Sequence, residues 1–124
     1  MHASHAAASL FGRLLISIIF ILAGFEKITG YQGTAQYMES FGVPGILLPG
    51  VIALELVGGL MILFGVFSRY AALALAFFTV VAGLVFHSNF ADPVQLIMFL
   101  KNLAIAGGLL LLSANGPGAY AIRD

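Results

Sequence analysis

Four long apolar stretches dominate this chain and decide what it can fold into. Each is close to the roughly 20 residues that an α-helix needs to cross a hydrocarbon core about 30 Å thick. Of the 124 residues, 61% are hydrophobic and only 8% are charged, whereas a soluble domain carries about a quarter charged residues. We therefore predict an all-α fold: an integral membrane four-helix bundle that forms a single transmembrane domain over residues 1–124. The predicted spans are residues 10–29, 46–67, 70–88 and 94–113.

The connection between the first two spans, "GYQGTAQYMESFGVPG", predicts a short additional helix over residues 34–42. Four of its residues recur at helical spacing and form a largely apolar stripe. These are Thr34, Tyr37, Met38 and Phe41. Gly42 can adopt the left-handed conformation that ends a helix, and Pro44 cannot continue one. We expect this helix to lie at the membrane interface; the alternative is an ordered loop with aromatic anchors.

Composition excludes several functions. The formal net charge is zero and no run of Lys or Arg is present, so nucleic acid is not expected as a partner. The chain has no cysteine, which removes thiol chemistry, thiolate metal sites and iron–sulfur clusters. No metal-spaced histidine cluster, phosphate-binding glycine loop or serine triad signature is present. We therefore predict no metal site and no intrinsic redox centre.

The distribution of basic residues favours one orientation in the membrane. With four spans, both termini and the middle loop share one side, which collects Arg13, Arg69 and Arg123 against Lys27 and Lys101 opposite. The positive-inside rule then predicts cytoplasmic termini. Arg13 and Arg69 are interpreted as cytoplasmic anchors.

The remaining polar residues of the spans converge on the other side. Since the spans alternate in direction, the end of the first and third and the start of the second and fourth meet there. The residues concerned are Glu26, Lys27, Glu55, His87, Lys101 and Asn102. At 1.5 Å per residue, Glu55 would lie roughly 14 Å and Lys101 roughly 10 Å below the start of their helices.

Charges at such depth need partners, because an ionised side chain at the bilayer centre costs about 2.5 to 3.5 kcal/mol. Helical spacing places them on the packing faces of the spans, and we predict an ion pair between Glu55 and Lys101. One interpretation is structural: the charges only join and orient the helices. The other is an outward-facing polar pocket, since ionisable groups within a membrane often mark function. Taken singly, Lys27 fits a lysine that extends to the interface, and His87 fits an interfacial hydrogen-bonding residue.

The chain resembles the DoxX family of small bacterial membrane proteins. The resemblance lies in Arg13 early in the first span and in the motifs "AGFEKITGY", "QYMESFGVP", "ALELVGGLMILFG" and "KNLAIAGGLLLLSANGPGA". It implies a multi-pass protein of the bacterial inner membrane. For some relatives it also implies quinone-linked oxidation of sulfur compounds or resistance to quinones and oxidative stress, beside other redox proteins.

The leading hypothesis is an accessory of quinone-linked redox or detoxification processes. Glu55 and Lys101, flanked by Glu26, Lys27 and His87, would line a pocket for a quinone, with electrons supplied by another protein. Whether the chain is itself an enzyme stays open. The rival hypothesis is a non-enzymatic scaffold or assembly factor whose ion pairs fix helix register. A proton-coupled carrier would require a homo-oligomer at this length.

Overall fold

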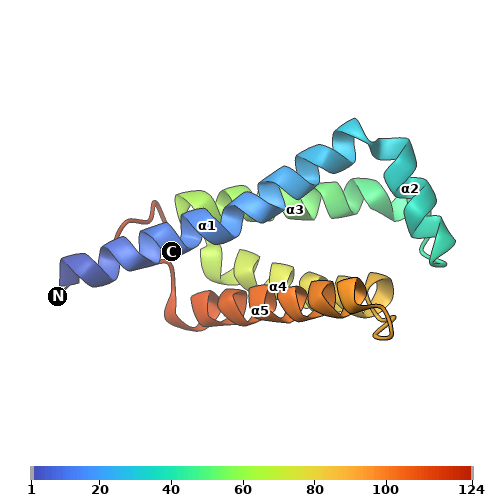
Figure 1. The fold of residues 1–124 in the computed structure, drawn as a ribbon. Helices are drawn as coiled ribbons and strands as arrows, with labels where there is room; N and C mark the ends of the chain where they lie inside the picture. The colour runs from blue at the N-terminus through green and yellow to red at the C-terminus, as the bar shows by residue number, and fades with distance from the viewer. Residues whose placement is uncertain (1, 124) are drawn as a thin grey trace.

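The structure of the protein, a computed structural model, describes residues 2–123, and its regular elements there are all helices (Figure 1). Four of its helices are long and apolar enough to cross a membrane. This confirms the predicted all-helical membrane fold. The elements are α1 (His2–Thr29), α2 (Tyr31–Ser40), a 3-10 turn η1 (Gly45–Leu47), α3 (Leu48–Phe64), α4 (Ser68–Phe86) and α5 (Pro93–Asn115).

The helix boundaries differ from the sequence prediction mainly at the N-terminus. Helix α1 begins at His2, eight residues before the predicted first span, because the leader is rich in alanine, the strongest helix former. The short helix between the first two spans is present as α2, and it begins three residues earlier than predicted. Helix α5 begins at Pro93, where Asp92 caps it by accepting a hydrogen bond from the Val94 amide at 3.0 Å.

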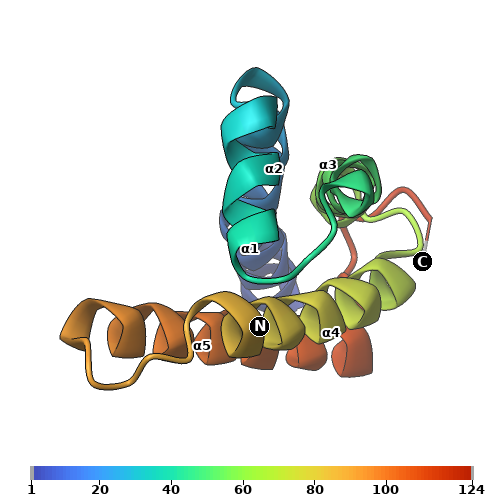
Figure 2. The same ribbon diagram turned by 90° about the vertical axis from the view of Figure 1, so that its right-hand side faces the viewer.

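The four long helices form two antiparallel pairs, α1 with α3 and α4 with α5, joined where α3 packs on α4 (Figures 1 and 2). Both termini lie toward one end of the molecule, called the tail end below. The opposite end, where α2 turns back from α1, is called the α2 end. At the α2 end the two pairs separate and α2 lies beyond their ends (Figure 1).

Two glycines set the register between α1 and α3. A Cβ at Gly24 would lie 2.7 Å from Leu56 Cγ, and one at Gly59 would lie 2.9 Å from Ile21 Cγ1. These are closer than side chains tolerate, so glycine is required for the helices to approach as they do. The consequence is that residues around 27 of α1 lie beside residues around 55 of α3.

The tail end is closed by the C-terminal segment. Helix α3 ends at Gly65 in the left-handed conformation (φ 69°), and the Val66 amide donates back to the Met61 carbonyl, which is a common helix stop. After α5, the C-terminal segment runs back to the end of α3, where the Arg123 amide donates to the Gly65 carbonyl at 2.9 Å. The sequence prediction treated this segment only as a short end after the last span.

Arg13 is buried and links three parts of the fold, a contact that its interpretation as a cytoplasmic anchor did not include. Its side chain is 2% exposed, and its Nη2 donates to the Tyr120 carbonyl of the C-terminal segment. It lies against Gly65 at the C-terminal end of α3, where the partial negative charge of the helix favours a cation. Arg13 therefore joins α1, α3 and the C-terminal segment.

The apolar core lies toward the tail end. It is built from α1, α3, α4 and α5, and its members include Phe20, Ile62, Ala72, Leu75 and Leu109. These side chains fill the space between the two helix pairs toward the tail end, and a cavity lies between the pairs in the α2 half.

Candidate functional site: a cavity with a buried ion pair

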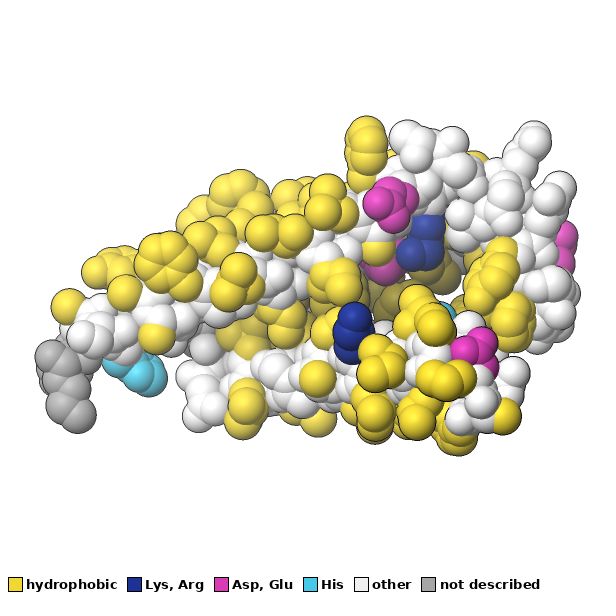
Figure 3. Space-filling view, in the orientation of Figure 1, with side chains coloured by type: hydrophobic (Ala, Val, Ile, Leu, Met, Phe, Trp, Pro, Cys, Tyr) yellow, Lys and Arg dark blue, Asp and Glu magenta, His cyan; other side chains and the backbone are white. Residues whose placement is uncertain are grey.

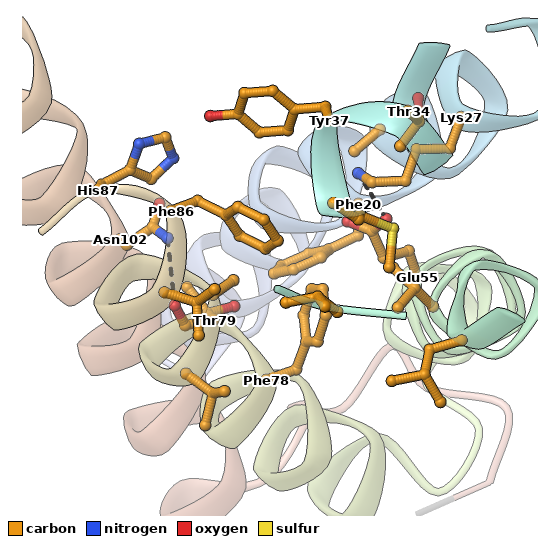
Figure 4. A pocket seen from close by; sticks show the side chains of 18 of the residues that line it. Phe20, Lys27, Thr34, Tyr37, Glu55, Phe78, Thr79, Phe86, His87 and Asn102 are labelled. Atoms are coloured by element: carbon orange, nitrogen blue, oxygen red, sulfur yellow. Dashed lines mark hydrogen bonds and ion pairs between the residues drawn. The ribbon is translucent and has the colours of Figure 1, made fainter. Parts of the chain in front are cut away.

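A cavity of about 400 Å³ lies between the two helix pairs in the α2 half (Figure 4). Every helix contributes to its wall. Most of the lining side chains are apolar, and Phe20 and Phe78 are among them (Figure 4). The polar side chains that line it are Lys27, Thr34, Tyr37, Glu55, Thr79, His87 and Asn102.

The charged feature of the cavity is an ion pair between α1 and α3. Lys27 Nζ lies 2.8 Å from Glu55 Oε1, with the lysine side chain 28% and the glutamate side chain 5% exposed (Figure 4). The predicted pairing of Glu55 with Lys101 is therefore wrong. That prediction counted depth from the start of each helix, whereas the close approach at Gly24 and Gly59 sets the level of Glu55 relative to Lys27.

Glu26 and Lys101 lie outside the cavity. Both residues are exposed, and neither lines the cavity. Within one chain, the expectation that all charges of the spans occupy packing faces does not hold for these two. On α5 the helix turns Asn102 and Ile105 toward the cavity instead.

His87 follows the last residue of α4 and faces the cavity from there (Figure 4). Its Nδ1 lies 2.9 Å from Oε1 of Gln95 on α5. An amide oxygen only accepts, so this contact assigns the hydrogen of the neutral ring to Nδ1 and leaves Nε2 as an acceptor. His87 makes a side-chain hydrogen bond, as expected from the sequence, and its position at the membrane interface stays a prediction. Gln95, which sets the tautomer, was not identified from the sequence.

Asn102 also has a structural contact. Its side-chain amide donates to the Thr79 carbonyl at 3.1 Å, close to Gly83 of α4 (Figure 4). Gly83, one turn further along α4, leaves room for the amide, because a Cβ there would lie 3.3 Å from Asn102 Nδ2. Asn102 thus holds α4 against α5 while it contributes to the cavity wall.

Helix α2 forms the wall at the α2 end. Its apolar stripe covers the cavity: Met38 is 5% exposed, and the Tyr37 ring stacks on Phe86 of α4 with centroids 5.6 Å apart. Phe41 joins them at 5.2 Å from Phe86. The helical spacing of this stripe was visible in the sequence. The sequence did not show that this stripe packs over a cavity, because it gives no position for α2 relative to α4.

The polar side chains of the cavity offer hydrogen-bond donors and acceptors to a ligand. Lys27 has hydrogens beyond the one directed at Glu55, and His87 offers an acceptor. Among residues 2–123, no group of three His, Cys, Asp or Glu side chains is placed to hold a metal ion.

Comparisons with known proteins place the chain in a family. The DoxX family model matches residues 8–88. The chain is 58% identical over 113 residues to the Escherichia coli inner membrane protein YqjF, covering 91% of this chain and 87% of that one. It is 38% identical over 120 residues to the Escherichia coli inner membrane protein YphA, covering 91% and 86%. No solved structure matches it.

A third relative, from Bacillus subtilis, carries the name "Putative oxidoreductase CatD" and is 33% identical over 76 residues, covering 61% of this chain and 57% of that one. The family match spans more than half of the chain, and the similarity to YqjF spans nearly all of it. With four helices suited to crossing a membrane, this is a multi-pass inner-membrane protein. It belongs to the DoxX family.

Proposed function

We propose that this protein is an accessory of quinone-linked redox or detoxification processes, and that its cavity binds the quinone. The observation that carries the proposal is the Lys27–Glu55 ion pair opening into an otherwise largely apolar cavity of about 400 Å³. Small-molecule sites are typically about 300 to 1,000 Å³, mostly apolar, with a few polar groups that fix orientation. A quinone has this pattern, with carbonyl oxygens on an apolar ring.

The polar groups suit both oxidation states of such a ligand. Lys27 can donate to a carbonyl oxygen of the quinone, and Nε2 of His87 can accept from a hydroxyl of the quinol. Reduction of a quinone takes up protons as well as electrons, and the Lys27–Glu55 pair offers a donor and an acceptor for them. Phe20 and Phe78 provide apolar surface for the ring.

The electrons are assigned to a separate redox protein. The sequence carries no cysteine, and residues 2–123 form no metal-binding group. The name of the Bacillus subtilis relative, "Putative oxidoreductase CatD", agrees with a redox context. We also propose that the termini are cytoplasmic, since three arginines belong to the tail-end side; the cavity then lies toward the opposite side of the membrane.

Binding of a short-chain ubiquinone to the protein in lipid nanodiscs tests the proposal. We expect saturable binding by isothermal titration calorimetry beyond the partitioning seen in empty nanodiscs. Glu55→Gln keeps the size of the side chain but removes the charge that positions Lys27, so it should weaken binding at least tenfold, which corresponds to about 1.4 kcal/mol.

Glu39→Gln is the matched control. Glu39 is an exposed carboxylate of α2 that does not line the cavity, and its replacement should change the dissociation constant by less than twofold. Uptake equal to that of empty nanodiscs, or equal losses in both variants, would refute the quinone site.

The rival function is a scaffold in which the ion pair only fixes the register of α1 and α3. Its support is that the pair joins those two helices at 2.8 Å, one turn from the tight contact between Gly24 and Leu56. The combined replacement Lys27→Met with Glu55→Leu separates the two functions, because buried pairs can often be exchanged for apolar residues without loss of stability. A scaffold would keep its activity in cells with this variant, whereas a quinone-binding protein would lose it.

A further inference from the structure

Two charged side chains of the membrane helices form no ion pair with another side chain of residues 2–123. Lys101 on α5 is exposed, and no carboxylate among residues 2–123 forms an ion pair with it. Glu26 on α1 is also exposed and unpaired within the same residues. Both lie in helices suited to span the membrane, Ala3–Thr29 and Pro93–Asn115, where an exposed charge is unfavourable against lipid.

The two charges lie at similar levels along the helices. Helices α1 and α5 meet where a Cβ at Gly108 would lie 3.2 Å from Ile16 Cδ1. From that contact Glu26 is ten residues along α1 and Lys101 seven residues along α5, in the same direction. At 1.5 Å per residue their levels differ by about 4.5 Å, which a lysine side chain can span.

The surface of α1 and α5 that carries Glu26 and Lys101 is poorly covered by the rest of the chain. Only 11% of the apolar window of α5 is buried, compared with 33% for α4. Figure 3 shows acidic and basic side chains on one side of the molecule, around the hollow between the two helix pairs. Around them the surface is apolar: Leu15 and Leu22 on α1 and Ile97 on α5 are all about half exposed or more.

We propose that a second copy of the chain covers this face, with Glu26 of each copy paired to Lys101 of the other. Two copies inserted in the same direction are related by a two-fold axis along the membrane normal, which keeps every residue at its own level. A two-fold interface is self-complementary, so one negative and one positive position at similar levels form two identical ion pairs. The exposed apolar residues beside them provide the packing. The inference does not depend on the quinone.

Charge reversal in separate copies tests the proposal. We expect the wild-type protein to be a dimer by cross-linking and mass measurement in lipid nanodiscs. Glu26→Lys and Lys101→Glu each place like charges together and should weaken dimerisation at least tenfold. Mixing the two variants should restore it to within threefold, because a Glu26→Lys copy and a Lys101→Glu copy again form two opposite-charge pairs.

Glu39→Lys is the control for the charge change itself. It alters an exposed residue of α2 away from this face, and it should leave the dimer unchanged. Circular dichroism checks that each variant is folded, and the double variant Glu26→Lys with Lys101→Glu should dimerise as the wild type does. A monomeric wild type in the bilayer, or rescue in the double variant without rescue in the mixture, would overturn the proposal, the latter because it indicates a pair within one chain.

Discussion

Lys27→Met is expected to lower the free energy of unfolding by about 3 to 5 kcal/mol, the range for breaking a buried ion pair by removing one partner. The reason is the asymmetry of burial within the pair. The side chain of Glu55 is 5% exposed and that of Lys27 is 28% exposed, so removal of the lysine leaves a nearly buried carboxylate without its partner. Glu55→Leu should cost less, because Lys27 can turn outward from the end of α1. Unfolding by SDS titration in mild detergent, followed by circular dichroism, measures both.

The combined variant Lys27→Met with Glu55→Leu provides the control. It leaves no unpaired charge, so it should recover most of the stability that Lys27→Met loses. If the combined variant is instead as unstable as the sum of the two single variants, the two side chains do not interact and the ion pair is not formed in the membrane.

Gly65→Val is expected to lower the free energy of unfolding by about 2 to 4 kcal/mol, from left-handed backbone strain together with overpacking. Gly65 has a φ of 69°, which a β-branched residue rarely adopts. A Cβ there would also lie 2.8 Å from Ala121 Cα and would collide with the guanidinium of Arg13. The variant should therefore detach the C-terminal segment, which limited proteolysis detects as faster cleavage near Tyr120, alongside the loss in SDS titration.

Gly107→Ala is the matched control for this effect. Gly107 lies inside α5, and a Cβ there has nothing within 4 Å. Alanine should leave stability unchanged or raise it by up to about 1 kcal/mol through its higher helix propensity. Equal destabilisation by both glycine replacements would contradict the role given to Gly65 and Arg13 at the tail end.

The membrane fold and the buried stripe of α1 follow from the sequence, because they rest on local regularities. Span length and hydropathy predict the four helices, and 3.6-residue spacing predicts that Arg13, Ser17, Phe20 and Gly24 share one face; all four are buried. The same spacing groups Glu55 with Gly58 and Ile62, which are buried as well. Periodicity within one helix is thus sufficient to find its packed side.

The pairing of the charges does not follow from the sequence, because it depends on the relative position of two helices. Lys27 and Glu55 are neighbours since Gly24 and Gly59 fix how far α3 slides along α1, and no pattern within either helix encodes that offset. The predicted position of Lys101 inside the pocket was wrong for a related reason. The spacing of α5 defines a stripe with Ala104 and Gly108 but does not say whether that stripe faces the same chain or another one.

Photolabelling by an azidoquinone in lipid nanodiscs, mapped by mass spectrometry, tests the central claim most directly, that the cavity beside the Lys27–Glu55 pair holds a quinone. Two adjacent residues of α4 distinguish the outcomes, because Phe78 lines the cavity, whereas Phe77 does not line it and is 75% exposed. The account predicts label at Phe78 that disappears with excess unlabelled quinone and in Glu55→Gln. Label at Phe77 and other exposed residues alone, unchanged by competitor, would contradict it.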